Sequence, residues 1–235
     1  MDRPDGTTAA ARFSITCEEL LLAAETETDT ETEREGEGGG ELVRSSDSTA
    51  HRLHALDSEI RSAIALAAPG LVFVHAGVVA VDGQAIVLPG LSMAGKTTLV
   101  AALVRAGATY LSDEYAVLAA DGLVHPYPRR LSVRGPGGRR EVPVSDIGGR
   151  AADGPVPVAL VASLTYHPDA TWSVCPTGAA DGAEALIANA VAARTRPTEV
   201  LRAAGIVARA ATHLAGERGD AAVAADALLR ALATI

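Results

Sequence analysis

A short glycine-rich loop between a predicted strand and a predicted helix constrains the fold of this chain more than any other feature. The loop, Gly90-Leu-Ser-Met-Ala-Gly95-Lys96-Thr97, fits the pattern G-x-x-x-x-G-K-[S/T]. The apolar run at 84–90 predicts the strand, and 97–106 predicts the helix, with Gly107 as a natural helix end. Such a loop directs backbone N–H groups and a helix N-terminus at phosphate oxygens. The sequence therefore predicts a nucleoside triphosphate site, the alternative being a glycine-rich turn that matches by chance.

Lys96 is the only lysine in a chain that otherwise uses arginine for its fixed positive charges. A slim ammonium group fits inside a closed loop where the wide planar guanidinium of arginine does not. We expect Lys96 to reach the β- and γ-phosphates of ATP and the Thr97 hydroxyl to bind Mg²⁺. The nucleotide-binding set predicted from the motif is Gly90, Ser92, Ala94, Gly95, Lys96, Thr97 and Thr98.

The 235 residues are enough for one sizeable core, which must be built from Ala, Val and Leu because only 3% of the residues are aromatic. Most of the net charge of -9 comes from an acidic run at 25–41. That run lacks apolar residues, so we expect a mobile loop that serves as a solvated linker or, alternatively, as a partner-binding element. We therefore divide the chain into an N-terminal segment, 1–47, and a catalytic domain, 48–235.

Several classes of partner are disfavoured by composition. No basic stripe with interleaved aromatic residues is present, so we expect no nucleic-acid partner. No apolar run reaches the roughly 18 residues that span a bilayer, and the first residues lack the layout of a secretion signal. Cys17 and Cys175 lie far apart and outside any metal-ligand spacing. We expect a cytoplasmic protein with no membrane partner.

The remaining patterns predict an α/β fold with a mixed, largely antiparallel sheet. Asp82-Gly83 and Asp121-Gly122 are hairpin turn signals, each between two apolar runs. The segment 129–154 is rich in Gly, Pro and Arg and predicts loops with little regular structure. Further elements are predicted as a strand or short helix at 12–23, a helix at 48–68, strands at 71–81, 108–112 and 156–166, and two or three Ala-rich helices from 181 to the end.

Absent motifs exclude several classes of nucleotide-binding protein. A guanine-specific N-K-x-D is impossible because Asn189 is the only asparagine, and the L-S-G-G-Q, H-R-D and D-F-G motifs are missing. The acidic pair Asp113-Glu114 follows Lys96 after only one predicted helix and one predicted strand. We expect these carboxylates to stand at the end of that strand, beside the phosphates. A solvated turn between two strands is the alternative.

The long run from Phe73 to Leu118 resembles the core of the HPr kinase/phosphorylase family. It joins a strand containing His75, a hairpin, the phosphate loop, a helix and an acidic pair. Leu131-Ser-Val-Arg134-Gly-Pro-Gly137 is similar to the second signature of the family, L-E-[IV]-R-G-x-G. The resemblance covers 71–137 and implies an HPr-kinase-like P-loop fold. Short relatives in this family are peptide kinases of ribosomal-peptide clusters, including lasso-peptide clusters.

The resemblance also implies roles for individual residues. Asp113 matches the general base toward a serine hydroxyl, and Glu114 stands where the family usually has a second Asp that helps to hold Mg²⁺ together with Thr97 and Asp113. His75 matches the strand histidine near the phosphates, and Arg134 matches the signature arginine that stabilises transferred charge. Ser132 replaces the signature Glu, so we expect kinase activity without the reverse reaction.

Plainer interpretations of these residues stay open. His75 is otherwise a core or strand-edge histidine. Arg134 is otherwise one of five arginines in a solvated basic loop, together with Arg129, Arg130, Arg139 and Arg140. As a functional alternative, that basic segment could clamp substrate phosphates or a peptide carboxylate.

We therefore expect an ATP- and Mg²⁺-dependent kinase that acts on a serine hydroxyl of a peptide or small protein, with a homo-oligomer possible. Two alternatives are a small-molecule hydroxyl kinase and a non-catalytic, ATP-binding regulatory module. A compact, preformed acceptor pocket favours the small molecule. An Asp113 side chain that points away from the phosphates favours the regulatory module.

Overall fold

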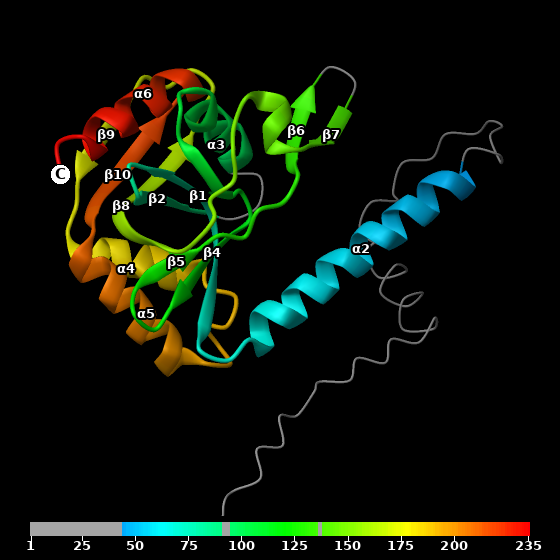
Figure 1. The fold of residues 1–235 in the computed structure, drawn as a ribbon, viewed down its shortest axis with the longest axis horizontal. Coiled ribbons are helices and arrows are strands. Elements are labelled where there is room, and N and C mark those ends of the chain that lie inside the picture. Colours follow the sequence, from blue (N-terminus) through cyan, green and yellow to red (C-terminus); the bar gives the residue numbers. More distant parts are fainter. Residues whose placement is uncertain (1–43, 91–94, 136–137) are drawn as a thin grey trace, which may run out of the picture. The chain divides into compact units, whose positions relative to one another are not determined.

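The computed structural model describes the backbone of residues 44–90, 95–135 and 138–235 (Figure 1) and the side chains of 56–90, 95–133 and 140–235. The segment predicted at 12–23, the acidic run 25–41, Cys17, Ser92 and Ala94 lie outside the described residues. The chain divides into two compact units, 1–63 and 64–235. The helix predicted at 48–68 is observed as α2 (Arg44–Ala67).

A β-hairpin leads into the glycine-rich loop. Strand β1 (Leu71–Val81) pairs antiparallel with β2 (Gln84–Pro89), and Val78 lies opposite Val87. Asp82 and Gly83 join the strands with φ angles of 49° and 78°. Two positive φ angles are typical of a type I′ turn, which matches the twist of the strands that it connects. The predicted hairpin is confirmed.

Five strands pair in a closed ring. Strand β1 continues antiparallel to β4 (Tyr115–Ala119), β4 to β5 (Leu123–His125), and β5 to β8 (Val156–Tyr166). Strand β8 then runs parallel to β2 and closes the ring. Because β1 and β8 are each 11 residues long, each has room to pair with different partners along its length. The strand β2 that precedes the glycine-rich loop therefore has a partner on both edges.

Three more strands extend the sheet. Strand β3 (Thr109–Ser112) lies antiparallel to β1, β10 (Thr212–Arg218) lies parallel to β8, and β9 (Ser173–Pro176) pairs with the outer edge of β10. Only the β2–β8 and β8–β10 pairings are parallel among the described strands. The predicted mixed, largely antiparallel sheet is confirmed.

Helices cover both faces of the sheet, as Figure 1 shows. Helices α3 (Lys96–Arg105) and α6 (Ala221–Leu232) pack over one core, which contains Leu99, Leu103 and Leu228. Helices α4 (Ala179–Ala188) and α5 (Pro197–Ala210) pack over the other. Small alanine side chains let each pair of helices approach closely, so a chain with few aromatic residues still buries a dense core.

The prediction of loops at 129–154 is wrong. Strands β6 (Leu131–Gly135) and β7 (Gly138–Val142) form a hairpin, followed by a short 3-10 helix, η1 (Val144–Ile147). Leu131 and Val142 lie opposite each other and are buried against the core under α3. These two side chains, together with Val133, thus anchor the hairpin, although Gly, Pro and Arg dominate the segment.

The Ala-rich helices predicted from 181 to the end are observed as α4, α5 and α6, but the sequence did not predict strand β10 between α5 and α6. Its sequence, THLAGER, has little local preference for a strand. The strand forms because β8 and β9 supply hydrogen-bonding partners on both of its edges. Tertiary pairing has therefore overridden local propensity.

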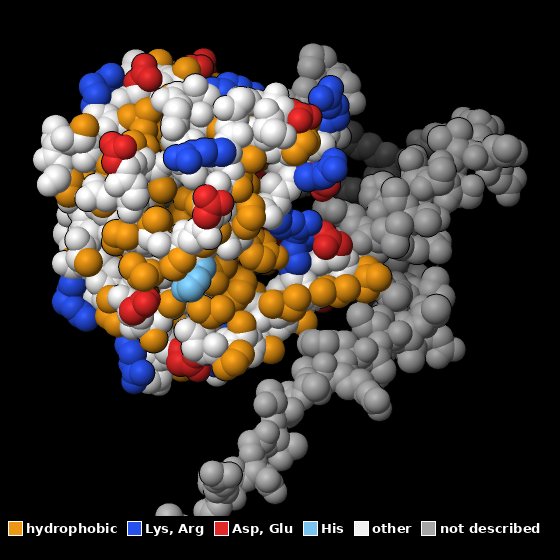
Figure 2. All heavy atoms as spheres, viewed as in Figure 1, with side chains coloured by type: hydrophobic (Ala, Val, Ile, Leu, Met, Phe, Trp, Pro, Cys, Tyr) orange, Lys and Arg blue, Asp and Glu red, His pale blue; other side chains and the backbone are white. Residues whose placement is uncertain are grey.

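Basic and acidic side chains are interspersed with hydrophobic ones on the face shown in Figure 2. None of the helices in the described part of the chain is both long enough and apolar enough to cross a membrane.

Candidate phosphate-binding and phosphoryl-transfer site

The two ends of the glycine-rich loop are tied together by Lys96. Gly90 follows the last residue of β2, and Gly95 precedes α3 with a φ angle of 72°. The Lys96 ammonium donates a hydrogen bond of 2.7 Å to the Gly90 carbonyl, across the whole loop. Burial lowers the pKa of Lys96, while the charges of Asp113 and Glu114 counteract that shift. The single lysine therefore lies at the mouth of the loop and close to the acidic pair.

Asp113 lies beside the first turn of α3. Its carboxylate accepts a hydrogen bond of 2.7 Å from the Thr97 hydroxyl and one of 2.8 Å from the Tyr110 hydroxyl. Burial and the charge of Asp113 raise the pKa of Tyr110, so the tyrosine keeps its proton and remains a donor. Thr97 and Asp113 are thus brought together, 16 positions apart in the sequence, while Thr98 is exposed.

Glu114 accepts a hydrogen bond of 3.0 Å from Arg129. The hydroxyl of Ser112 accepts the backbone N–H groups of Glu114 and Tyr115, which shapes the turn between β3 and β4. Both carboxylates of the pair therefore have defined partners, rather than extending from a fully solvated turn.

Asp113 and Thr97 form an oxygen-rich pair, and the charge of the neighbouring Glu114 also acts on Lys96. No cluster of three or more His, Cys, Asp or Glu side chains that could hold a metal occurs among the described residues. Mg²⁺ usually binds through one or two carboxylates together with substrate phosphates and water, so it does not need such a cluster. The chemistry of the donor set fits magnesium.

His75 contacts the start of the loop through its backbone. Its ring centroid is 4.9 Å from that of Tyr115, its backbone carbonyl accepts the Gly90 N–H, and its own N–H bonds to the carbonyl of Asn189. Burial and the nearby Lys96 charge lower the pKa of His75 below its ordinary value of 6.5. A neutral imidazole therefore faces the site.

The lowered pKa of His75 predicts a loss of stability in acid. Above the pKa of the unfolded chain the histidine is neutral in both states, but below it the unfolded chain binds a proton more readily than the folded one. The free energy of unfolding should therefore fall between about pH 7.5 and about pH 5.5 more steeply in the wild type than in a His75→Gln variant. Urea denaturation of both proteins at the two pH values measures this, and identical pH dependence would contradict it.

The five arginines of 129–140 do not share one environment. Arg129 bonds to Glu114, and Arg130 and Arg140 are exposed. Arg134 lies in β6 opposite Arg139 of β7, and the side chains of both are outside the described residues.

Arg218, at the end of β10, also contacts the site, although no sequence motif singles it out. It is 3% exposed and donates hydrogen bonds to the carbonyls of Gly95, at 2.9 Å, and Gly219, at 3.2 Å. Its guanidinium lies 5.0 Å from the ring centroid of Tyr166. The sequence signal that could have found it is a charged residue at the end of a strand, but that strand was itself missed.

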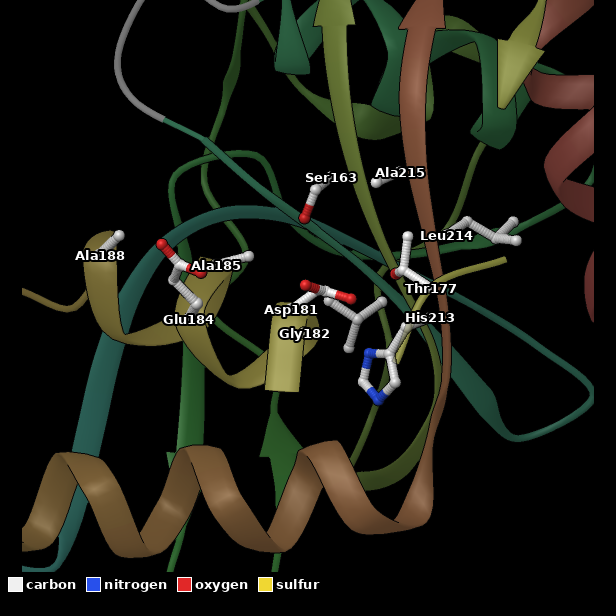
Figure 3. A pocket seen from close by; sticks show the side chains of 11 residues that line it. Ser163, Thr177, Asp181, Gly182, Glu184, Ala185, Ala188, His213, Leu214 and Ala215 are labelled. Carbon is white, nitrogen blue, oxygen red and sulfur yellow. The ribbon is translucent and has the colours of Figure 1, made fainter. Parts of the chain in front are cut away.

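A separate hollow of about 230 Å³ lies between α4 and the strands β8 and β10 (Figure 3). Ser163, Thr177, Asp181 and Glu184 contribute its polar side chains, and the other lining residues are mostly small or apolar. Ser163 belongs to β8, which runs parallel to β2. It lies two positions after Val161, the residue of β8 that pairs with Val87 of β2. The hollow is therefore one strand away from the start of the glycine-rich loop.

The wall of this hollow depends on Gly182, which packs against the buried ring of His213 (Figure 3). A Cβ at Gly182 would lie 1.9 Å from Nδ1 of His213, whose Nε2 bonds to the Ala208 carbonyl. We predict that Gly182→Ala lowers the free energy of unfolding by about 1–3 kcal/mol through overpacking. Gly154→Ala, where a Cβ meets open space, is the matched control in urea denaturation. Equal stability of the two variants would contradict the prediction.

No known family model matches this chain, and neither does any curated protein. Function is therefore inferred from the described residues and their chemistry.

Proposed function

We propose that this protein is an ATP- and Mg²⁺-dependent kinase that transfers the γ-phosphoryl group to a serine hydroxyl of a peptide or small protein, most simply a ribosomal peptide precursor. The observation that carries the proposal is the 2.7 Å hydrogen bond between Thr97 and Asp113. This bond holds the Asp113 carboxylate next to Thr97, which directly follows Lys96 in the motif. An HPr-kinase-like P-loop fold is part of the same proposal.

The binding step relies on the loop and its lysine. Backbone N–H groups at the start of α3 lack partners within the helix and are suited to phosphate oxygens. Lys96 would exchange its bond to the Gly90 carbonyl for the β- and γ-phosphates. Magnesium, when bound, neutralises charge on those phosphates, and Thr97, Asp113 and Glu114 would hold it directly or through water.

The transfer step relies on Asp113. Its carboxylate accepts the proton of the attacking serine hydroxyl, while the serine oxygen forms a bond to the γ-phosphorus. The bond from the γ-phosphorus to the bridging oxygen breaks, and ADP leaves with that electron pair. The Tyr110 and Thr97 hydroxyls orient the carboxylate, and the neutral His75 and the signature arginine Arg134 are the candidates for stabilising charge on the transferred group.

The hollow beside α4 supports a second candidate function, a small-molecule hydroxyl kinase. Its volume of about 230 Å³ is below the range of typical ligand pockets, so it suits a single side chain or a small polar molecule. A regulatory module without catalysis gains no support, because Asp113 contacts Thr97 rather than pointing away from the loop.

The test is incubation with γ-labelled ATP, Mg²⁺ and the peptide encoded by a neighbouring small gene, followed by intact mass and site mapping. We expect one added phosphoryl group on a serine of the peptide. Transfer of label only to small hydroxylated molecules would favour the second candidate. ATP binding without transfer to either acceptor would overturn both kinase proposals.

A further inference from the structure

Arg218 is held on several sides before it reaches the glycine-rich loop. Its guanidinium bonds to the Gly219 carbonyl and stacks on Tyr166, and its backbone carbonyl accepts the N–H of His167. A side chain fixed in this way has already lost most of its rotamer freedom. Its contact with Gly95 is therefore made by a rigid group rather than by a flexible surface arginine.

The contact is specific for glycine at position 95. Gly95 has a φ angle of 72°, and a Cβ there would lie 2.6 Å from a guanidinium nitrogen of Arg218. The backbone conformation and the packing of Arg218 therefore each require the absence of a side chain. The guanidinium occupies the space that any other residue at Gly95 would fill.

The bonded atom decides what this contact can do. The Gly95 carbonyl belongs to the peptide group that also carries the N–H of Lys96. Because a peptide group is planar and trans, its C=O and N–H point in opposite directions. Arg218 bonds to the carbonyl at 2.9 Å and Leu99 N–H bonds to the same oxygen at 3.2 Å. These two donors fix the orientation of the peptide group, and with it the direction of the Lys96 N–H, which points the opposite way in the same plane.

We infer that Arg218 is a positioning residue of the phosphate site, which holds the Gly95–Lys96 peptide so that its N–H is aimed at a phosphate oxygen before the nucleotide arrives. This inference rests on the phosphate-binding part of the proposed function and assigns a role to a residue far from the motif in sequence. Arg218 would affect the binding of the ligand's phosphates and not that of its nucleoside. Pre-orientation of this kind improves affinity because less order has to be created on binding.

The test compares Arg218→Met with Arg196→Met. Arg196 is the matched control because it also donates to backbone carbonyls, those of Ala65, Ala68 and Leu71, but it lies at the start of α5. Both substitutions leave backbone carbonyls without a donor and should lower stability, so the comparison separates a general loss of stability from a specific loss of phosphate affinity. Dissociation constants for Mg·ATP and for Mg·pyrophosphate, measured by calorimetry, and melting temperatures are obtained for both variants.

We expect Arg218→Met to weaken both ligands by a similar factor of about ten or more, the range typical of a charged hydrogen bond. Arg196→Met should leave both constants within about twofold of the wild type, within the spread of ordinary substitutions distant from a site. Arg218→Lys can reach one of the two carbonyls but cannot bond to both, so it should give intermediate affinity. If the methionine variant does not fold, the affinity of the lysine variant tests the inference.

Three outcomes with the variants would overturn the inference. These are unchanged affinity in both Arg218 variants, equal loss in the Arg218 and Arg196 variants, and loss for Mg·ATP without loss for Mg·pyrophosphate. A wild-type protein that binds neither ligand would overturn it as well. A wild-type protein that binds both ligands yet phosphorylates no acceptor would refute the kinase proposal alone and leave this inference standing.

Discussion

Asp113→Asn is expected to leave Mg·ATP binding nearly unchanged and to reduce phosphoryl transfer by about a thousandfold, within the range typical of a lost general base. The amide keeps nearly the size and shape of the carboxylate, and it can still contact the Thr97 and Tyr110 hydroxyls that bond to Asp113. It cannot accept the proton of the acceptor hydroxyl. The affinity is measured by calorimetry and the transfer rate by single-turnover kinetics with γ-labelled ATP.

Asp153→Asn is the matched control, because Asp153 is an exposed carboxylate between β7 and β8. It should alter neither the affinity nor the rate. If Asp113→Asn weakens ATP binding as much as it slows transfer, Asp113 acts in binding and its role as base is wrong.

Lys96→Ala is expected to weaken Mg·ATP binding by about ten- to a hundredfold, because the site loses a charged hydrogen bond to the phosphates. Lys96→Arg is the sharper variant, since it keeps the positive charge. The ammonium of Lys96 spans the loop to the Gly90 carbonyl, and a planar guanidinium is too wide for that position. We therefore expect arginine not to restore the affinity. Calorimetric titration with Mg·ATP measures both variants.

Arg105→Ala removes an exposed charge from the last turn of the same helix and serves as the control. It should bind Mg·ATP as the wild type does. Unchanged affinity in Lys96→Ala would refute the assignment of the phosphate loop, and full affinity in Lys96→Arg would refute the steric explanation for the single lysine.

Elements with strong local signals were predictable from the sequence. Asp82-Gly83 encodes its own turn. The apolar strands on either side of this turn, β1 and β2, can both be buried when they pair antiparallel with each other. Gly107, with a φ angle of 104°, ends α3 as expected. Within the site, the proximity of Thr97 and Asp113 follows because one helix and one strand return the chain to its starting edge.

The parts that could not be predicted depend on partners distant in sequence. Strand β10 is stabilised by β8 and β9, and the β6–β7 hairpin is anchored by Leu131 and Val142 against α3. Arg218 could not be selected because its contact with Gly95 spans 123 positions. Tyr110 was missed for another reason: a tyrosine in a buried strand gives no sign that its hydroxyl bonds to a carboxylate.

The closed ring of strands limits how β2, the strand before the glycine-rich loop, can move. Over residues 85–87, strand β2 is paired with β1 on one edge and with β8 on the other, so this part of it has no free edge from which to fray. Its amide protons should exchange with solvent only through large-scale unfolding, at rates set by global stability. Strand β2 therefore forms a rigid support for Gly90, whose carbonyl accepts the hydrogen bond from Lys96.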